Sequence, residues 1–405
     1  MPKEELILTR ITDVLKTDYL PLFDNQLTTD PSPFLEKIKK ENLVSDPIHA
    51  AAPYGLVGGF GFSAEDEATP AAAHQKYIPF NCRTADMYVN IEISNKSIIL
   101  AQSNAASMVN AVDAEIMGAF TAAKYHMSRA LFGDGRGIVA KATSAGTGAA
   151  GANTVTLDSV KLLREGILID IYASGGTTPA ANQRRVLAIN RATKTVAFDG
   201  NAFAAASGSF ITVQNSYNRE IIGLGSIYGV DYNGVNTGRT TIYDRTITDY
   251  PFLEPHVVDA DNDITDIVLY DAVRYARDYK NTEIDLFMCG DDAYSAYHQY
   301  MIERNIQIVQ RCDFKGGAKG FEVIVGDRGV TIVNERFVPA NEIWGVNTGD
   351  WSFKKSALDF VTYQNGSAFI LLEDKSIFRA LIACYGNIIC QNPGGCVRII
   401  KANRV

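Results

Sequence analysis

The longest regular hydrophobic pattern lies between residues 101 and 137, where apolar side chains recur at every third or fourth position. Its apolar positions are Met108, Val112, Ile116, Ala119, Phe120, Ala123, Met127, Ala130 and Leu131. This spacing places them on one stripe of an α-helix, with polar residues on the remaining surface. Ser103 or Asn104 can cap the start and Gly133 can end the helix. The pattern therefore predicts a strut of roughly 40 Å.

Alternation of apolar and polar residues predicts a strand just before this helix. Met87, Val89, Ile91 and Ile93 alternate with polar residues, as in a half-buried strand. The segment 54–62 is rich in glycine and aromatic residues, and an acidic tip at 64–70 follows it. We expect the two segments to form a long hairpin, with 87–93 as its returning strand.

The first 52 residues show no long regular pattern of apolar and polar positions. They contain a short amphipathic helix candidate at 4–15, followed by prolines at positions 31, 33 and 47. Because proline interrupts both helices and sheets, the part of the chain after residue 15 cannot be one compact element. This region is expected to be an extended arm.

Beyond the long helix, an Ala/Gly/Thr-rich segment leads to residue 153, and a series of short strand patterns follows. The strand patterns are at 154–157, 167–172, 185–189, 195–198 and 210–213, with a hairpin turn at 190–194. Such spacing predicts a small β-barrel or sandwich.

From about residue 240, helices alternate with strands, which indicates a mixed α/β domain. The expected helices are at 265–279 and from 291 onwards, and the expected strands are at 284–288, 306–309, 321–325 and 329–333. Asn365–Gly366 is a strong hairpin signal between strands at 360–363 and 367–372. Further strand patterns at 377–389 and 396–400 predict a long antiparallel sheet that closes the chain.

Composition narrows the class of protein. An apolar fraction of 46% and a charged fraction of 21% are typical of a soluble globular protein, and 405 residues suffice for two or three compact units. A net charge of −8 argues against a protein that mainly grips nucleic acid through phosphates. The sequence has no apolar run of roughly 18 residues and starts with acidic residues, so we expect neither a membrane helix nor a secretory signal. Its six cysteines form no C-x-x-C pair and are expected to be reduced and buried.

Glycine-rich segments offer no catalytic motif. Gly133, Gly135 and Gly137 follow the end of a helix, whereas phosphate-binding loops precede a helix, so a helix-stop turn is the preferred interpretation. Gly223-Leu-Gly-Ser226 lacks the spacing of a nucleophile elbow. The five histidines are scattered. We expect no catalytic residue, no cofactor and no metal.

Two acidic clusters also have structural interpretations that are preferred over metal binding or catalysis. Asp259, Asp261 and Asp263 resemble the start of a calcium loop, but Ile264 and Tyr270 stand where that loop needs Gly and Glu. A solvated acidic loop is preferred, and a metal-dependent α/β enzyme using these carboxylates is the alternative from a different class. Asp291-Asp292 is explained as the start of a helix, and the basic tail at 398–404 as a solvated end.

The order of these elements resembles that of the major capsid proteins of tailed bacteriophages, the Hong Kong 97-type fold. The segments that carry the resemblance are 88–94, 128–140, 154–158 and 216–224. It implies an α+β fold with the following parts: an N-terminal arm at 1–52, an E-loop hairpin at 53–101, the spine helix of the peripheral (P) domain at 102–139, a β-rich insertion domain at 140–225, mainly the axial (A) α/β domain at 226–350, and returning P-domain strands at 351–405.

The resemblance implies a viral structural protein, not an enzyme, that assembles from pentamers and hexamers into an icosahedral shell enclosing double-stranded DNA. The expected partners are other copies of the chain, a portal, a decoration protein and a separate scaffolding protein, since about fifty residues before the hairpin are too few for a fused scaffolding domain. No membrane is involved. The chain is expected in the virion, after assembly in the host cytoplasm. An encapsulin-type nanocompartment is the nearest alternative, and the extra β-rich segment favours the virus.

A hairpin of about fifty residues cannot cover its own large apolar side chains, so a neighbouring subunit is the expected partner. The residues expected at this subunit interface are Phe60, Phe62, Tyr77, Ile78 and Phe80. Some members of the family crosslink subunits through a loop lysine. Lys76 is the only lysine between Glu41 and Asn95, and we interpret it as an ordinary exposed lysine.

Overall fold

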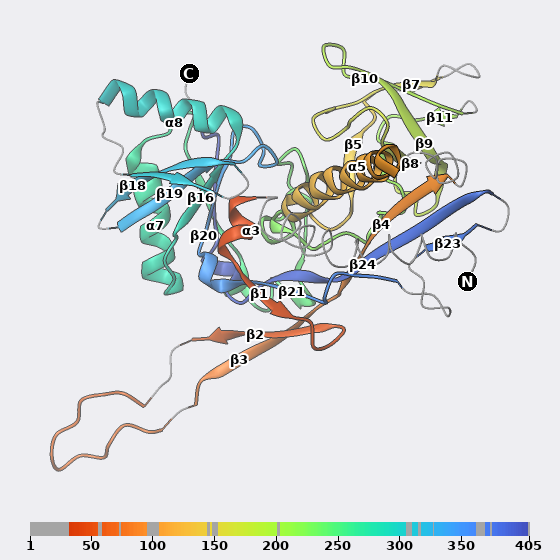
Figure 1. Cartoon of the computed structure of the whole chain (residues 1–405). Coiled ribbons are helices and arrows are strands. Elements are labelled where there is room, and N and C mark those ends of the chain that lie inside the picture. The colour runs from red at the N-terminus through yellow and green to blue at the C-terminus, as the bar shows by residue number, and fades with distance from the viewer. Residues whose placement is uncertain are drawn as a thin grey trace.

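The computed structural model describes residues 32–55, 59–72, 74–94, 105–143, 146–147, 153–200, 203–304, 310–314, 317–326, 328–361, 369–372 and 375–403. Within these residues the fold is a mixed α+β fold with few helices and many strands (Figure 1). Four predictions fall outside them: the helix at 4–15, the caps Ser103 and Asn104, the strand at 306–309 and the turn Asn365–Gly366.

The predicted long helix is present as α5, Ala105–Phe132, and it ends at Gly133 as expected. In the part of the helix whose side chains are described, the buried apolar residues are Phe120, Met127, Ala130, Leu131 and Phe132. The side chains of 105–116 are outside the description, so the first half of the apolar stripe stays a prediction. In the described part of the chain, no helix is both long and apolar enough to cross a membrane.

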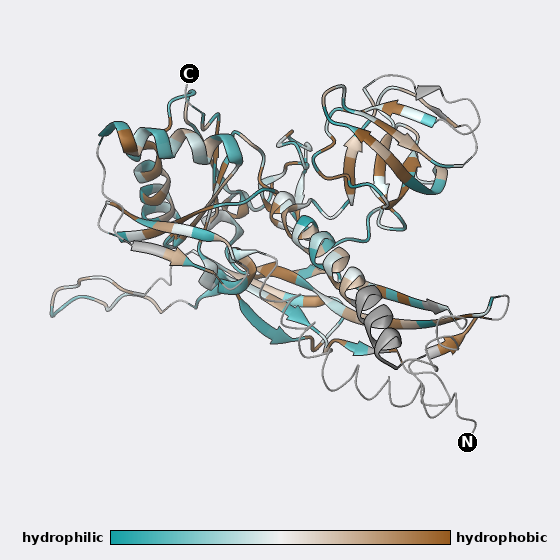
Figure 2. Ribbon diagram, turned by 45° about the horizontal axis from the view of Figure 1, so that its top comes forward, coloured by the Kyte–Doolittle hydropathy of each residue, from teal (hydrophilic) through white to brown (hydrophobic). Residues whose placement is uncertain are grey.

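Helix α5 lies along a central sheet built on β24, Ile377–Cys390 (Figure 2). Three strands follow one another along one edge of β24: β21 Trp351–Lys355, β22 Asp359–Phe360 and β23 Phe369–Leu371. Strand β4, Ala85–Ser94, pairs along the other edge. The described ends of the hairpin expected between 360–363 and 367–372 do not pair with each other, because β22 and β23 both pair with β24 and run in the same direction. The rest of that hairpin lies outside the described residues.

The expected hairpin before the helix also needs correction. Its two strands are β2, Ile48–Tyr54, and β3, Lys76–Cys82, paired from Ile48 with Cys82 to Tyr54 with Lys76. The alternating segment at 87–93 lies instead in β4 of the central sheet. Period-2 alternation identified the strand correctly, but it carries no information about which strand is the partner.

Residues 32–52 do not form an extended arm. Helix α3, Pro33–Lys37, has Ser32 as its N-cap and Pro33 in its first turn. Phe34 and Leu35 are fully buried, because they pack into the body of the molecule. Strand β1, Lys39–Asn42, then adds to the central sheet parallel to β21. The prolines were compatible with order here because one of them starts a helix.

The β-rich segment forms a closed barrel, one of the two expected architectures. Its six strands pair in the order β5-β12-β8-β9-β10-β7, and an antiparallel bridge between Ala142 and Leu157 joins the last to the first. The strands are β5 Ile138–Lys141, β7 Asn153–Thr156, β8 Leu168–Tyr172, β9 Pro179–Asn190, β10 Thr195–Phe198 and β12 Phe210–Val213. Two short strands, β6 Gly146–Thr147 and β11 Ala204–Ala205, pair with each other.

The α/β domain contains a seven-stranded sheet in the order β15-β25-β20-β16-β19-β18-β17. Its elements are β15 His256–Asp259, α7 Asp266–Lys280, β16 Leu286–Cys289, α8 Asp291–Arg304, β17 Gln310–Asp313, β18 Lys319–Val325, β19 Arg328–Asn334, β20 Ile343–Val346 and β25 Val397–Ile400. The helices α7 and α8 share one hydrophobic core with one face of this sheet. Side chains on the other face, such as Met288 and Trp344, belong to the core that includes the end of α5.

Strand β25 corrects the expected end of the chain. It was expected in a closing antiparallel sheet with the other C-terminal strands. Instead it lies inside the α/β sheet, parallel to β15 and antiparallel to β20. The chain turns between the two sheets through η4, Pro393–Gly395, where the Gly394 backbone passes close to Phe252.

The remaining described elements are short. They are α6 Leu224–Tyr228, β13 Thr241–Ile242, β14 Arg245–Thr246, η2 Pro251–Leu253 and η3 Thr348–Asp350. The α/β domain and the barrel lie on opposite sides of α5, and the β2–β3 hairpin projects away from both (Figure 1).

Candidate assembly surface

The hairpin is anchored at its root to the turn between β13 and β14. The ring of Phe80 stacks on Tyr243 with centroids 4.9 Å apart and nearly parallel planes. The Asn81 backbone N–H donates to the Asp244 carboxylate at 3.0 Å, and Arg245 Nε donates to the Pro79 carbonyl at 2.6 Å. Tyr54 also packs against Phe252, with ring centroids 5.1 Å apart. These contacts fix the direction in which the hairpin leaves the body.

The outer part of the hairpin has no such cover. The exposed fraction is 85% for Phe60, 96% for Phe62 and 60% for Tyr77. The two phenylalanine rings contact each other edge to face at 5.4 Å, which covers little of either. The acidic residues 65–67 are also fully in solvent. Adjacent exposed aromatic rings are a candidate contact surface for a partner.

The structure separates the five side chains that the sequence grouped at an interface. Phe60, Phe62 and Tyr77 are exposed, and Ile78 is partly buried. Phe80 corrects the expectation, because it is 1% exposed within its own chain, under Tyr243. The hairpin can bury this side chain because the β13–β14 turn, about 160 residues further along the chain, packs against its root. Lys76 is exposed, as interpreted.

Four segments meet where the hairpin enters the body, and Arg83 connects them. Its Nη2 donates to the carbonyls of Gly135 at 3.1 Å and Glu220 at 2.8 Å. Asn387 of β24 donates to the Arg83 carbonyl at 2.8 Å and accepts from the Ile222 N–H at 3.0 Å. Burial lowers the pKa of the Arg83 guanidinium. The junction ties the hairpin, the end of α5, the segment after the barrel and the central sheet into one unit.

The buried ion pair at this junction joins Arg129 of α5 to Glu220. Both side chains are more than nine-tenths buried, and the guanidinium meets both carboxylate oxygens. The nearby Gly137 has φ +74°, and a Cβ at this residue would lie 2.7 Å from the Ser216 carbonyl. The glycines after α5 are therefore required by a tight passage of the backbone, which agrees with the interpretation as a turn after the helix.

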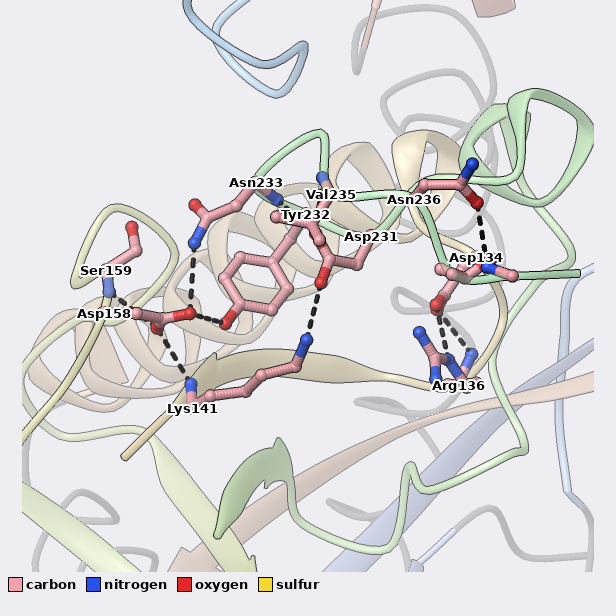
Figure 3. A network of polar contacts seen from close by, with 12 residues as sticks. Asp134, Arg136, Lys141, Asp158, Ser159, Asp231, Tyr232, Asn233, Val235 and Asn236 are labelled. Atoms are coloured by element: carbon pink, nitrogen blue, oxygen red, sulfur yellow. Dashed lines mark hydrogen bonds and ion pairs between the residues drawn. The ribbon is translucent and has the colours of Figure 1, made fainter. Parts of the chain in front are cut away.

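The barrel is mounted on the loop 229–238 by a polar network (Figure 3). Lys141 Nζ lies 2.7 Å from an Asp231 carboxylate oxygen. The Asp158 carboxylate accepts from the Lys141 N–H at 2.9 Å, from the Tyr232 hydroxyl at 2.5 Å and from Asn233 Nδ2 at 3.1 Å. Burial, with the Asp158 carboxylate, raises the pKa of Tyr232 well above its usual range. The barrel is thus held by side chains as well as by its two chain connections.

Sequence reasoning missed Arg83, Asn387, Asp158 and Tyr232, which make these two junctions. None stands in a local motif, because each acts on a residue far away in the chain. The start of α3 could have been found from the sequence, because a serine followed by a proline is typical of the first residues of a helix.

A cavity beside the Arg129–Glu220 pair has a volume of about 20 Å³. Asp134, Tyr232 and Phe337 also line it. This volume is room for about one water molecule, so the cavity is too small for a substrate.

The acidic loop at 259–263 is held by its own contacts. Asp259 accepts from Lys401 Nζ at 2.6 Å and from the Asp261 N–H at 2.9 Å. Among the described residues, no group of three or more His, Cys, Asp or Glu side chains is arranged to hold a metal ion. Asp291 and Asp292 form the first turn of α8, as the sequence indicated.

No protein-family model matches the sequence, and no curated protein matches it. Similar solved structures include the capsid asymmetric unit of cyanophage A-1(L), at TM-score 0.49 and 10% identity, covering 94% of this chain and 92% of that chain. The satellite phage P4 procapsid with its size determination protein is similar at TM-score 0.41 and 9% identity, covering 99% and 98%. The SrpI encapsulin complex from Synechococcus elongatus PCC 7942 is similar at TM-score 0.42 and 10% identity, covering 92% and 89%. Phage capsid proteins, the family that the sequence resembles, are thus among the solved structures similar to most of the chain.

Proposed function

We propose that the chain is the major capsid protein of a tailed bacteriophage, a viral structural protein that assembles from hexamers and pentamers into an icosahedral shell around double-stranded DNA. The observation that carries the proposal is the projecting β2–β3 hairpin, whose outer aromatic rings Phe60 and Phe62 are almost fully exposed. A second copy of the chain is the partner that covers them. Contacts of this kind join identical subunits into closed symmetric assemblies.

Each part of the fold has a role under this proposal. The hairpin is the E-loop, α5 with the central sheet is the P domain, the α/β domain is the A domain, and the barrel is an insertion domain that braces or decorates the shell. The anchored root of the hairpin supports this assignment, because Phe80 and Asn81 hold an extension that reaches beyond its own subunit. Many such weak contacts reinforce one another in a lattice, since each formed contact raises the effective concentration of the next.

The proposal also names the setting of the shell. The chain is a component of the virion, assembled in the host cytoplasm with a separate scaffolding protein, a portal and a decoration protein. With a net charge of −8, it encloses DNA without binding a particular sequence.

Negative-stain electron microscopy and sedimentation of the purified chain test the proposal. We expect rings of five or six subunits, or megadalton shells. A protein that stays monomeric at all concentrations, with and without a scaffolding protein, would overturn it. Shells isolated from the native source that contain a cellular protein in place of DNA would instead establish the encapsulin-type alternative.

A further inference from the structure

Helix α3 and the residues at its two ends are held to the rest of the molecule by three contacts. The Ser32 hydroxyl donates to the Glu335 carboxylate at 2.9 Å and accepts from the Phe34 N–H at 3.2 Å. Phe34 packs edge to face on Trp351, with ring centroids 5.2 Å apart. Lys37 Nζ donates to Thr331 Oγ1 at 3.0 Å. We call residues 32–38 the strap, because they cross from the α/β domain to the central sheet.

The strap covers the carboxyl group of Glu335, an acidic side chain that is almost completely buried. Glu335 follows β19 and is 6% exposed. Its hydrogen-bond donors are the Ser32 hydroxyl and the Phe337 backbone N–H, and the cations that face it are Arg336 beside it and Lys161 from the barrel. The Arg336 guanidinium lies over the rings of Tyr125 and Phe337. Burial outweighs these groups and raises the pKa of Glu335 to about 7.

We propose that the strap is a pH-sensitive fastening, closed most firmly when Glu335 is protonated and opened more readily when this carboxyl group ionises. The position of the strap over Glu335 couples the two events, because opening the strap gives the carboxyl group access to water, and this outweighs the loss of the Ser32 hydrogen bond. The ionised form is then solvated, and the acidity of the group returns toward its ordinary value.

The sign follows from proton linkage. The closed state holds the proton up to about pH 7, and the open state loses it near the ordinary value of 4.5. Closure therefore has its full stabilisation below about pH 4.5, and this stabilisation decreases until the pH has passed about 7. Between pH 6 and pH 8 the equilibrium constant for opening rises about tenfold.

Amide hydrogen exchange on the full chain tests the proposal, followed at Glu36 and Ile38, whose N–H groups donate to the carbonyls of Ser32 and Phe34. After correction for intrinsic exchange, we expect the opening constant of these amides to rise about tenfold from pH 6 to pH 8. Amides of β16, away from the strap, serve as the internal reference.

Two variants and a control variant make the test specific. Glu335→Gln keeps an acceptor for Ser32 and cannot ionise, so the pH dependence should disappear, while the exposed Glu65→Gln should retain it. Ser32→Ala removes a donor that favours the ionised carboxylate. In this variant the opening constant of the strap amides should therefore rise more between pH 6 and pH 8 than it does in the unmodified chain. An unmodified chain whose strap amides show no rise beyond that of β16 overturns the proposal. A Glu335→Gln variant that keeps the full rise also overturns it.

Discussion

At the scale of single residues, the junction at the end of α5 depends on a few polar side chains removed from water. Arg129 and Glu220 pair with each other, and Arg83 and Asn387 bond to backbone groups of three segments. Replacing a whole buried pair by apolar residues is often tolerated, whereas removing one partner leaves a buried charge uncompensated. These residues therefore fix the relative positions of the segments, and their loss is costly.

Replacing Glu220 by Gln should lower the free energy of unfolding by about 3 to 5 kcal/mol, because Arg129 is left buried without its counter-charge. Urea unfolding followed by circular dichroism measures the change. Glu283→Gln is the matched control, since the Glu283–Arg328 pair is about half exposed and its loss should cost no more than about 1 kcal/mol. Equal losses in the two variants would contradict this account.

At the scale of elements, the barrel is a module inserted into the chain after α5. The chain enters and leaves at neighbouring points, because the Asn218 N–H donates to the Arg136 carbonyl at 3.0 Å. Val155, Ile169, Val196 and Ile211 are nearly completely buried among its strands, and they belong to a hydrophobic cluster that continues into the body of the molecule. Outside these connections, its contacts with the body include those of Asp158 and Lys141 with the loop 229–238, and the hydrogen bond from the Tyr125 hydroxyl to the Leu162 carbonyl.

Replacing residues 138–215 by a short Gly/Ser linker should leave a body that folds cooperatively, because the connection bridges two points already joined by a hydrogen bond. The excised segment should fold alone as a β-structured domain. Circular dichroism and thermal melting of both proteins check this. A body without a cooperative transition would show that the barrel is part of the main core.

A proline in α5 tests the strut. Ala119→Pro removes a helix hydrogen bond and crowds the preceding turn, at a cost of about 3 kcal/mol or more. We expect a lower helical content by circular dichroism and no shells by electron microscopy. Ala119→Ser is the control, since it keeps the backbone donor. Normal shells from the proline variant would refute a structural role for a continuous α5.

At the scale of the whole molecule, we expect the folding stability of the subunit and the association between subunits to depend on different parts of the hairpin. Its root belongs to the core through Phe80, whereas its outer rings, Phe60 and Phe62, contact each other and are largely exposed. Changes at the outer rings should therefore act on association and leave the folded subunit intact.

The double variant Phe60→Ser and Phe62→Ser should keep the melting temperature of the subunit and lose shells or rings in sedimentation. Phe80→Ala is the contrasting variant, expected to lower the free energy of unfolding by about 3 to 5 kcal/mol because a buried ring is removed. If the double variant assembled like the unmodified chain, the exposed rings would not be an assembly surface.

Much of this organisation could be predicted from local pattern. The helix α5, the barrel strands β10 and β12, and the alternation of β16, α8 and β19 carry strong short-range signals. Exposure of Phe60 and Phe62 also agrees with the hairpin inferred from sequence. Such signals depend on residues within one or two turns of each other.

Strand partners could not be predicted in the same way. The pairing of β4 with β24 joins residues nearly 300 positions apart in the sequence, and β1 pairs with β21 across a similar sequence separation. Burial of Phe80 depends on Tyr243, and the strap depends on Glu335. Nothing within either local segment specifies these partners, because they are chosen by packing of the whole chain.

The position of β25 inside the α/β sheet sets the order of events during synthesis. Among the strands that the structure describes, β15 pairs only with β25, and β20 is paired on one side alone, with β16, until β25 is added. The domain therefore cannot be completed until translation has passed residue 400. A nascent chain still on the ribosome presents the hairpin before the domain is finished. Completion of the α/β domain therefore depends on a strand that is synthesised about 140 residues after β15.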